Sequence, residues 1–148
     1  MMFDTIELNR QFQANSHSCS IFQPYHGTTL HQYCVKKGYF KKGELAEDLT
    51  YASPLKQNHI KHEEIQGIAK CFALYVKLPK SMWDFIKIAE KDDERGKKMH
   101  QELLMVYKRD YAPKAESDVG GGTRIVVDPN KIYQGDVMGR LKEIQNQN

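Results

Sequence analysis

Cysteine is scarce in this sequence, and the three thiols stand far apart. Cys19, Cys34 and Cys71 are the only cysteines among 148 residues. Three is an odd number, and cysteines this far apart favour buried thiols over a disulfide framework. We therefore predict a protein of the reducing cytoplasm whose three thiols pack in its core. The spacing predicts no metal site.

Long apolar runs and a strong charge of one sign are also missing. No stretch approaches the run of about 18 apolar residues that spans a bilayer, and the N-terminus does not have the pattern of a signal peptide. The net charge is only +3, which predicts neither a nucleic-acid partner nor a membrane partner. Hydrophobic residues make up 40% of the chain, enough for one domain with a core.

Several catalytic signatures are incomplete. His59-x-x-His62 lacks the rest of a zinc-protease motif, and we interpret both histidines as solvated residues at the start of a helix. Gly120-Gly121-Gly122-Thr123 is not followed by the lysine of a phosphate-binding loop, so we interpret it as a linker. No G-x-S-x-G elbow for a serine nucleophile is present.

The most informative stretch combines a proline, a glycine and two threonines. Residues 18–22 form a short apolar run that predicts a buried strand. Pro24 cannot continue a central ladder, and Gly27 can adopt a positive φ. Thr28 or Thr29 can cap the helix that follows. A loop between a strand and a helix often binds ligands in α/β folds, although an ordinary tight connection has the same pattern.

The rest of the chain is rich in helical periodicity. Gly38 suits a left-handed helix end, Asp93 suits a helix start, and Trp83 lies on an apolar stripe that predicts a core position. Residues 123–127 are the only other stretch with strand character. We predict helices at residues 3–13, 30–37, 61–78, 80–91 and 94–110, with a weak helix near 136–145.

Five segments, taken in order, resemble a known family. They are Asp4-Thr5-Ile6-Glu7-Leu8-Asn9-Arg10, Ile21-Phe22-Gln23-Pro24-Tyr25-His26-Gly27-Thr28, Cys34-Val35-Lys36-Lys37-Gly38-Tyr39, Phe72-Ala73-Leu74-Tyr75-Val76-Lys77-Leu78-Pro79 and Asp92-Asp93-Glu94. Together they resemble the end of the catalytic barrel in radical S-adenosylmethionine enzymes, in the class with a cobalamin-binding domain. The resemblance covers about residues 3–111 and only the C-terminal part of such an enzyme.

The resemblance implies a fold and a division of the chain. The fold class is α+β and mostly α: the last strand–helix unit of a partial (β/α) barrel, followed by a helical extension. The barrel-end unit is expected at residues 1–44 and the helical extension at residues 45–111. Residues 112–148 are expected to form a linker and a weakly ordered tail.

The resemblance also implies a site and its chemistry. The loop Pro24-Tyr25-His26-Gly27-Thr28 faces cofactor and substrate in such barrels; alternatively, Tyr25 packs and His26 is solvated. The intact enzymes use a four-iron cluster, S-adenosylmethionine and sometimes cobalamin for radical-initiated methyl transfer or related chemistry. The cluster is held by C-x-x-x-C-x-x-C, which is absent here. We therefore expect no cofactor in this chain and no activity of the chain alone.

Two kinds of partner follow from these expectations. The first is the missing N-terminal barrel part, or a partner subunit that carries it. The alternative function is a non-catalytic helical module that binds another protein. An unpaired strand at residues 18–22 would also recruit a second copy of the chain or pair with residues 123–127.

Overall fold

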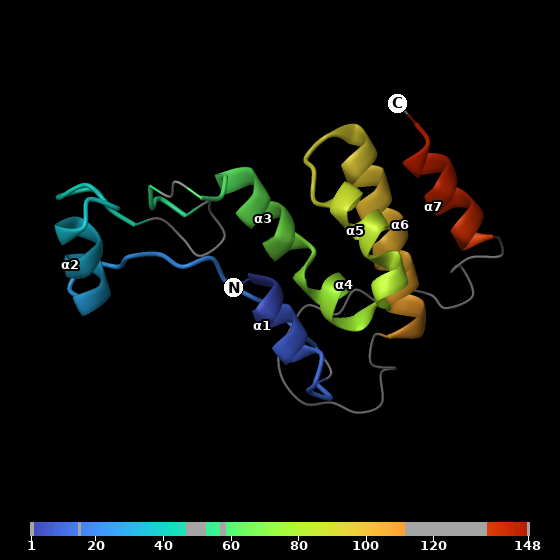
Figure 1. Cartoon of the computed structure of the whole chain (residues 1–148), viewed down its shortest axis with the longest axis horizontal. Helices are drawn as coiled ribbons and strands as arrows, with labels where there is room; N and C mark the ends of the chain where they lie inside the picture. Colours follow the sequence, from blue (N-terminus) through green and yellow to red (C-terminus); the bar gives the residue numbers. More distant parts are fainter. Residues whose placement is uncertain (1, 15, 47–52, 57–58, 112–135, 148) are drawn as a thin grey trace. The chain divides into compact units, whose positions relative to one another are not determined.

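The computed structural model describes residues 2–14, 16–46, 53–56, 59–111 and 136–147. These residues form α-helices and one turn of 3-10 helix (Figure 1). No strand occurs among them, so the predicted (β/α) barrel unit is wrong. The predicted strand at 123–127 and the glycine linker lie outside the described residues. The elements are α1 (Met2–Asn9), α2 (Thr29–Lys36), α3 (His62–Lys70), α4 (Phe72–Lys77), η1 (Lys80–Met82), α5 (Trp83–Ala89), α6 (Glu94–Asp110) and α7 (Val137–Gln145).

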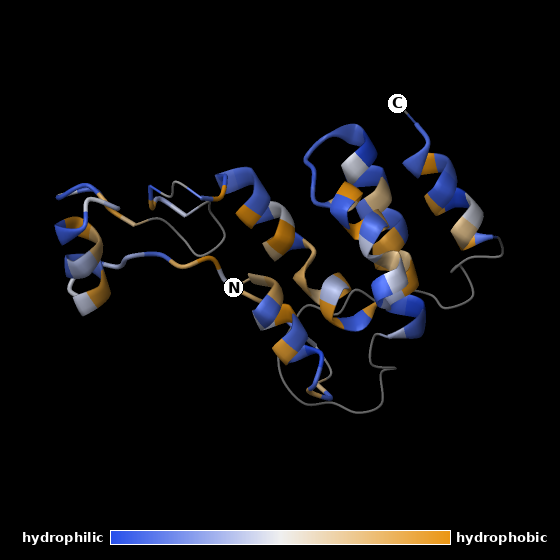
Figure 2. Ribbon diagram, in the orientation of Figure 1, coloured by the Kyte–Doolittle hydropathy of each residue, from blue (hydrophilic) through white to orange (hydrophobic). Residues whose placement is uncertain are grey.

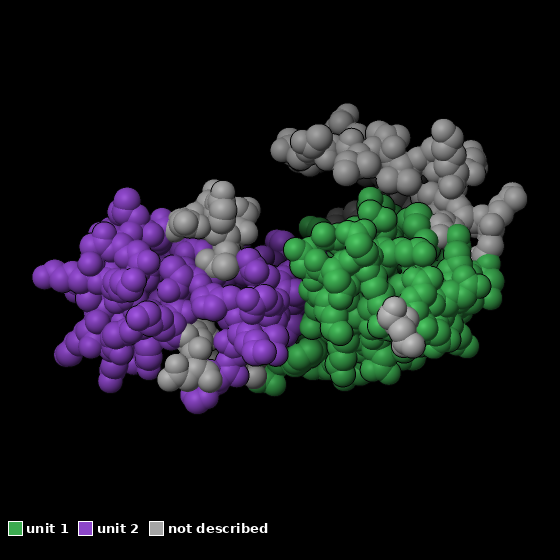
Figure 3. All heavy atoms as spheres, turned by 90° about the horizontal axis from the view of Figure 1, so that it is seen from above, with its two compact units in different colours: residues 1–17, 71–148 green, residues 18–70 purple. Residues whose placement is uncertain are grey.

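The chain divides into two compact units (Figure 3). Unit 1 consists of residues 1–17 and 71–148, and unit 2 consists of residues 18–70. The boundary at Cys71 interrupts the helix that the apolar stripe predicts for residues 61–78. Cys71 has φ −94° and ψ 7°, so α3 and α4 are separate helices. The domain boundaries expected at residues 44 and 111 stay a prediction.

Unit 1 is a helical cluster in which α6 contacts α4, α5 and α7. Polar and apolar residues are interspersed along its helices (Figure 2), and the apolar ones supply the core. The helix predicted near 136–145 is confirmed as α7, and its Leu141 is fully buried. The side chains that are almost wholly buried in unit 1 are Ile6, Leu74, Tyr75, Leu78, Ile86, Met99, Leu103 and Leu141.

Local signals at the start of α6 agree with the structure. Asp93 is the N-cap, and its Oδ1 accepts a hydrogen bond from Gly96 N at 2.6 Å. Such a cap satisfies a backbone donor that the first turn leaves unpaired. Arg95, in the same turn, donates from Nε to Ile144 O at 2.9 Å and from Nη2 to Gln145 O. The start of α6 therefore holds the C-terminal end of α7.

Aromatic rings join α1 to α4 and α5. Phe3, Tyr75 and Trp83 lie with ring centroids 5.2 to 5.7 Å apart. Trp83 is half-buried, which corrects its predicted core position. The Arg10 guanidinium lies 5.9 Å and Lys80 Nζ lies 5.3 Å from the Trp83 ring centroid.

Unit 2 contains the segment that was predicted as a strand. Residues 18–22 run without regular structure toward α2 (Figure 1), and no backbone N–H in this segment donates to a described backbone carbonyl. Phe22 is 44% exposed. A strand requires a neighbouring strand to pair with, and none is present among the described residues. Ser53 Oγ instead donates to Phe22 O at 3.4 Å.

Candidate functional site

The predicted loop folds as a tight turn that begins α2. Pro24 is fully buried, while Gly27 has φ +82°, a conformation that favours glycine. Thr28 Oγ1 donates to Tyr25 O at 2.7 Å and accepts from His31 N at 3.1 Å. Thr28, one of the two residues predicted to cap this helix, is therefore the N-cap of α2. The turn fixes the positions of the two side chains between Pro24 and Gly27.

Those two side chains differ in their surroundings. Tyr25 is 43% exposed. His26 is also exposed, but its ring lies against His31 of α2, with centroids 4.1 Å apart and planes at 38°. His31 in turn meets the edge of buried Phe40 at 5.6 Å. The His31 Nε2 is buried and has no hydrogen-bond partner among the described residues.

The arrangement around the turn offers aromatic contacts and imidazole nitrogens. A neutral imidazole has one ring nitrogen that donates a hydrogen bond and one that accepts. No carboxylate is recorded in contact with His26 or His31 in the described part of the chain, so no acid–base pair is assembled there. The turn can therefore contact a ligand or a partner, and its described groups do not form a catalytic pair.

The three thiols do not come together as ligands. Cys34 and Cys71 are buried, as predicted, whereas Cys19 is exposed, which corrects its predicted core position. The Cys19 Sγ donates to Ala69 O at 3.8 Å, and partial burial of the sulfur raises the pKa of the Cys19 thiol. No three metal-ligating side chains converge in the described ranges. These residues do not fit a four-iron cluster, which needs convergent thiolates.

Sequence reasoning overlooked a polar anchor at the end of α4. The Arg10 side chain, just beyond α1, reaches the last carbonyls of α4, which a helix leaves unpaired. A positive charge there also interacts favourably with the negative C-terminal end of the helix dipole. Arg10 Nη1 donates to the carbonyl oxygens of Tyr75 at 2.6 Å, Val76 at 2.9 Å and Leu78 at 2.8 Å. A lone arginine in the sequence carries no signal for such a distant contact.

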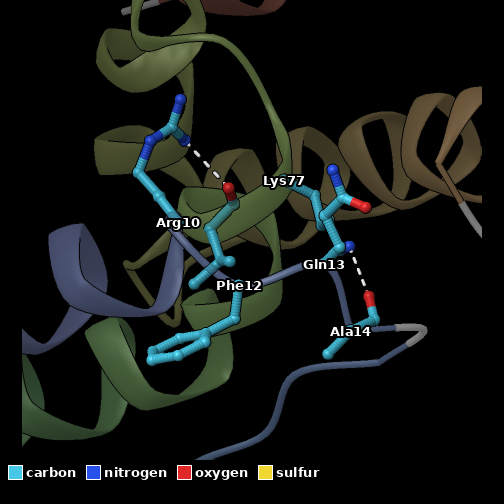
Figure 4. Close-up of a pocket in the computed structure, with 6 residues that line it drawn as sticks. Arg10, Phe12, Gln13, Ala14 and Lys77 are labelled. Atoms are coloured by element: carbon cyan, nitrogen blue, oxygen red, sulfur yellow. Dashed lines mark hydrogen bonds between the residues drawn. The ribbon is translucent and has the colours of Figure 1, made fainter.

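A cavity of about 540 Å³ lies beside this anchor. Figure 4 shows Arg10 directed at the Val76 carbonyl and Lys77 directed at Ala14. Lys77 Nζ donates to Ala14 O at 2.6 Å. Arg10 and Lys77 both donate hydrogen bonds to backbone carbonyl oxygens of the chain. We therefore infer that these two side chains hold residues 10–14 against α4. The cavity is lined by Arg10, Phe12, Gln13, Ala14, Val76 and Lys77.

His17 follows the segment that Lys77 holds. Its pKa is lowered from the ordinary value, first by burial of the imidazole and then by the positive charge of Lys77. Both effects disfavour the protonated ring. His17 Nε2 is buried and accepts no hydrogen bond from a described group.

The comparisons with known proteins found no matching family model, no matching curated protein and no matching solved structure. Within the described ranges, no helix has the length and apolar character needed to cross a membrane.

Proposed function

We propose that this chain serves as the C-terminal portion of a radical S-adenosylmethionine enzyme of the cytoplasm and does no chemistry alone. In this proposal it binds a companion protein, defined as the product of the neighbouring open reading frame that carries C-x-x-x-C-x-x-C. The companion supplies the iron–sulfur cluster, on which S-adenosylmethionine is reductively cleaved. The first support for this assignment is the resemblance of five segments of the sequence, in order, to such enzymes.

The observation that carries the proposal is the state of residues 18–22. This segment leads into the turn at Pro24 and forms neither helix nor strand. Here its backbone N–H groups donate to no described backbone carbonyl, and Phe22 is largely exposed. Backbone groups left in this state can be satisfied by another chain. A partner that covers residues 18–22 would also lie next to Tyr25 and His26, the side chains we assign to its substrate and cofactor.

The experiment that tests the proposal is reconstitution of the two proteins. The companion, with its cluster reconstituted anaerobically, is mixed with this chain, S-adenosylmethionine and dithionite, and 5′-deoxyadenosine is measured. We expect product to form at least about tenfold faster with both proteins than with either alone, because the chain completes the enzyme. An equal rate without this chain contradicts the proposal, as does a genome with no such neighbouring frame.

A second function is favoured by a different observation. Among its described residues, unit 2 exposes more large apolar side chains than it buries, which is typical of a docking surface. A non-catalytic module would bind a partner without the cluster motif, and 5′-deoxyadenosine would not form. The exposed side chains are Phe22, Tyr25, Leu30, Tyr33, Tyr39 and Leu45.

A further inference from the structure

Helix α2 has an apolar face that the described structure leaves uncovered. The sequence places Leu30, Tyr33 and Cys34 on one side of the helix, yet only Cys34 is buried. Leu30 is 58% exposed and Tyr33 is 51% exposed. Residues three apart are neighbours on a helix surface. The two side chains therefore form one exposed apolar patch, which we call the α2 face.

Two lysines lie at the C-terminal end of α2, beside the α2 face. No aspartate or glutamate occurs from residue 8 to residue 43. Lys37 follows the helix, and its Nζ lies 5.9 Å from the Tyr33 ring centroid. Neither Lys36 nor Lys37 forms an ion pair with a described residue.

We infer that the α2 face docks into an apolar groove on the companion protein whose rim carries carboxylates. This inference rests on the proposed function and names the surface through which the two proteins meet. Burial of Leu30 and Tyr33 drives the association, and the lysines set its orientation and its sensitivity to salt. The rim is proposed to be acidic because carboxylates there would pair with Lys36 and Lys37.

The same charges argue against a second copy as the occupant. In a symmetric contact the same patch meets itself. Two copies joined through the α2 face would bring the lysines of one helix against those of the other. Like charges brought together at an interface oppose association. A partner with carboxylates removes this cost.

The test measures the affinity of the companion protein for variants of the full chain. Leu30→Asp and Tyr33→Asp each place a carboxylate on the α2 face, and we expect each to weaken binding by about thirtyfold or more, as for a central contact residue. Lys36→Gln combined with Lys37→Gln is expected to weaken binding by about tenfold and to reduce its dependence on salt. Leu8→Asp is the matched control, because Leu8 is 53% exposed and lies in α1 of unit 1, outside α2.

The outcomes separate the two proposals. Unchanged helicity by circular dichroism shows that each variant still folds. If the wild-type chain binds and the α2-face variants bind equally well, the inference is wrong while the proposed function stands. If the wild-type chain does not bind, the proposed function fails and the inference fails with it. Self-association that Leu30→Asp abolishes would identify a second copy as the occupant and overturn the inference.

Discussion

At the scale of single residues, unit 1 is stabilised by two polar contacts that the sequence does not predict. Arg10 and the α4 carbonyls are separated by more than 60 positions along the chain. Tyr75 OH donates to Glu90 Oε1 at 2.5 Å, and the ring of Tyr75 is fully buried. Both contacts are non-local, so neither periodicity nor local motif could predict them.

We predict that Arg10→Met lowers the free energy of unfolding by about 2 kcal/mol, because a charged donor to three carbonyls is lost. Methionine keeps much of the aliphatic stem, so the change isolates the guanidinium. Urea denaturation measures the loss. The control is Gln11→Met, at an exposed neighbouring position. A loss below about 0.5 kcal/mol for Arg10→Met would show that the anchor does not stabilise the fold.

The Tyr75 contact predicts a dependence of stability on alkaline pH. Burial, and then the hydrogen bond to Glu90, raise the pKa of the Tyr75 phenol well above its ordinary value. Above about pH 10 the unfolded chain releases this proton while the folded chain retains it. The folded state then binds more protons, so stability falls as the pH rises.

Tyr75→Phe tests this dependence. Below pH 10 the variant is expected to lose about 1–2 kcal/mol of stability, because the hydrogen bond to Glu90 is removed. Above pH 10 its stability is expected to fall less steeply than that of the wild-type chain. Tyr39→Phe, at an exposed ring, is the control for loss of one phenol. Parallel pH profiles for Tyr75→Phe and the wild-type chain would refute the assigned pKa shift.

At the scale of elements, helices were predictable and the strand was not. The α6 helix follows from its apolar spacing and from Asp93, both of which act within a few residues. Residues 18–22 have strand composition, but a strand forms only through pairing with a distant segment. The apolar stripe of residues 61–78 gave no sign of the break at Cys71. Apolar periodicity predicts which face of a helix is buried. It does not predict whether the backbone continues as one helix.

Gly96 provides a prediction at this scale. A Cβ on Gly96 would lie 2.2 Å from Lys91 O and 2.9 Å from Ile88 O, both backbone atoms that cannot move aside easily. Gly96→Ala is therefore expected to destabilise the chain by about 2 kcal/mol, although alanine favours helix.

Gly139→Ala is the matched control for that substitution. In α7, the added Cβ would meet Asp136 Oδ2 at 2.4 Å, which is the end of a side chain that can rotate away. Gly139→Ala should then leave thermal stability unchanged or raise it. A Gly96→Ala variant as stable as Gly139→Ala would show that α5 and α6 do not meet as closely as described.

At the scale of the whole molecule, the sequence predicted the place of the turn but not its environment. Gly27 and Thr28 act locally, and both adopt the expected conformation. The contact of His26 with His31, and the exposure of the α2 face, depend on how unit 2 folds as a body. The balanced total charge also concealed the stretch of residues 8–43 that lacks acidic residues.

Hydrogen exchange at the Ile21 and Phe22 amides tests most directly whether a companion protein completes this chain. We predict fast exchange at both amides in the chain alone, at every chain concentration, because neither donates to a described backbone carbonyl. Saturation with the companion protein should slow both amides by at least about tenfold, because the partner covers the segment. Strong protection in the chain alone, or unchanged fast exchange in the saturated complex, would contradict the account.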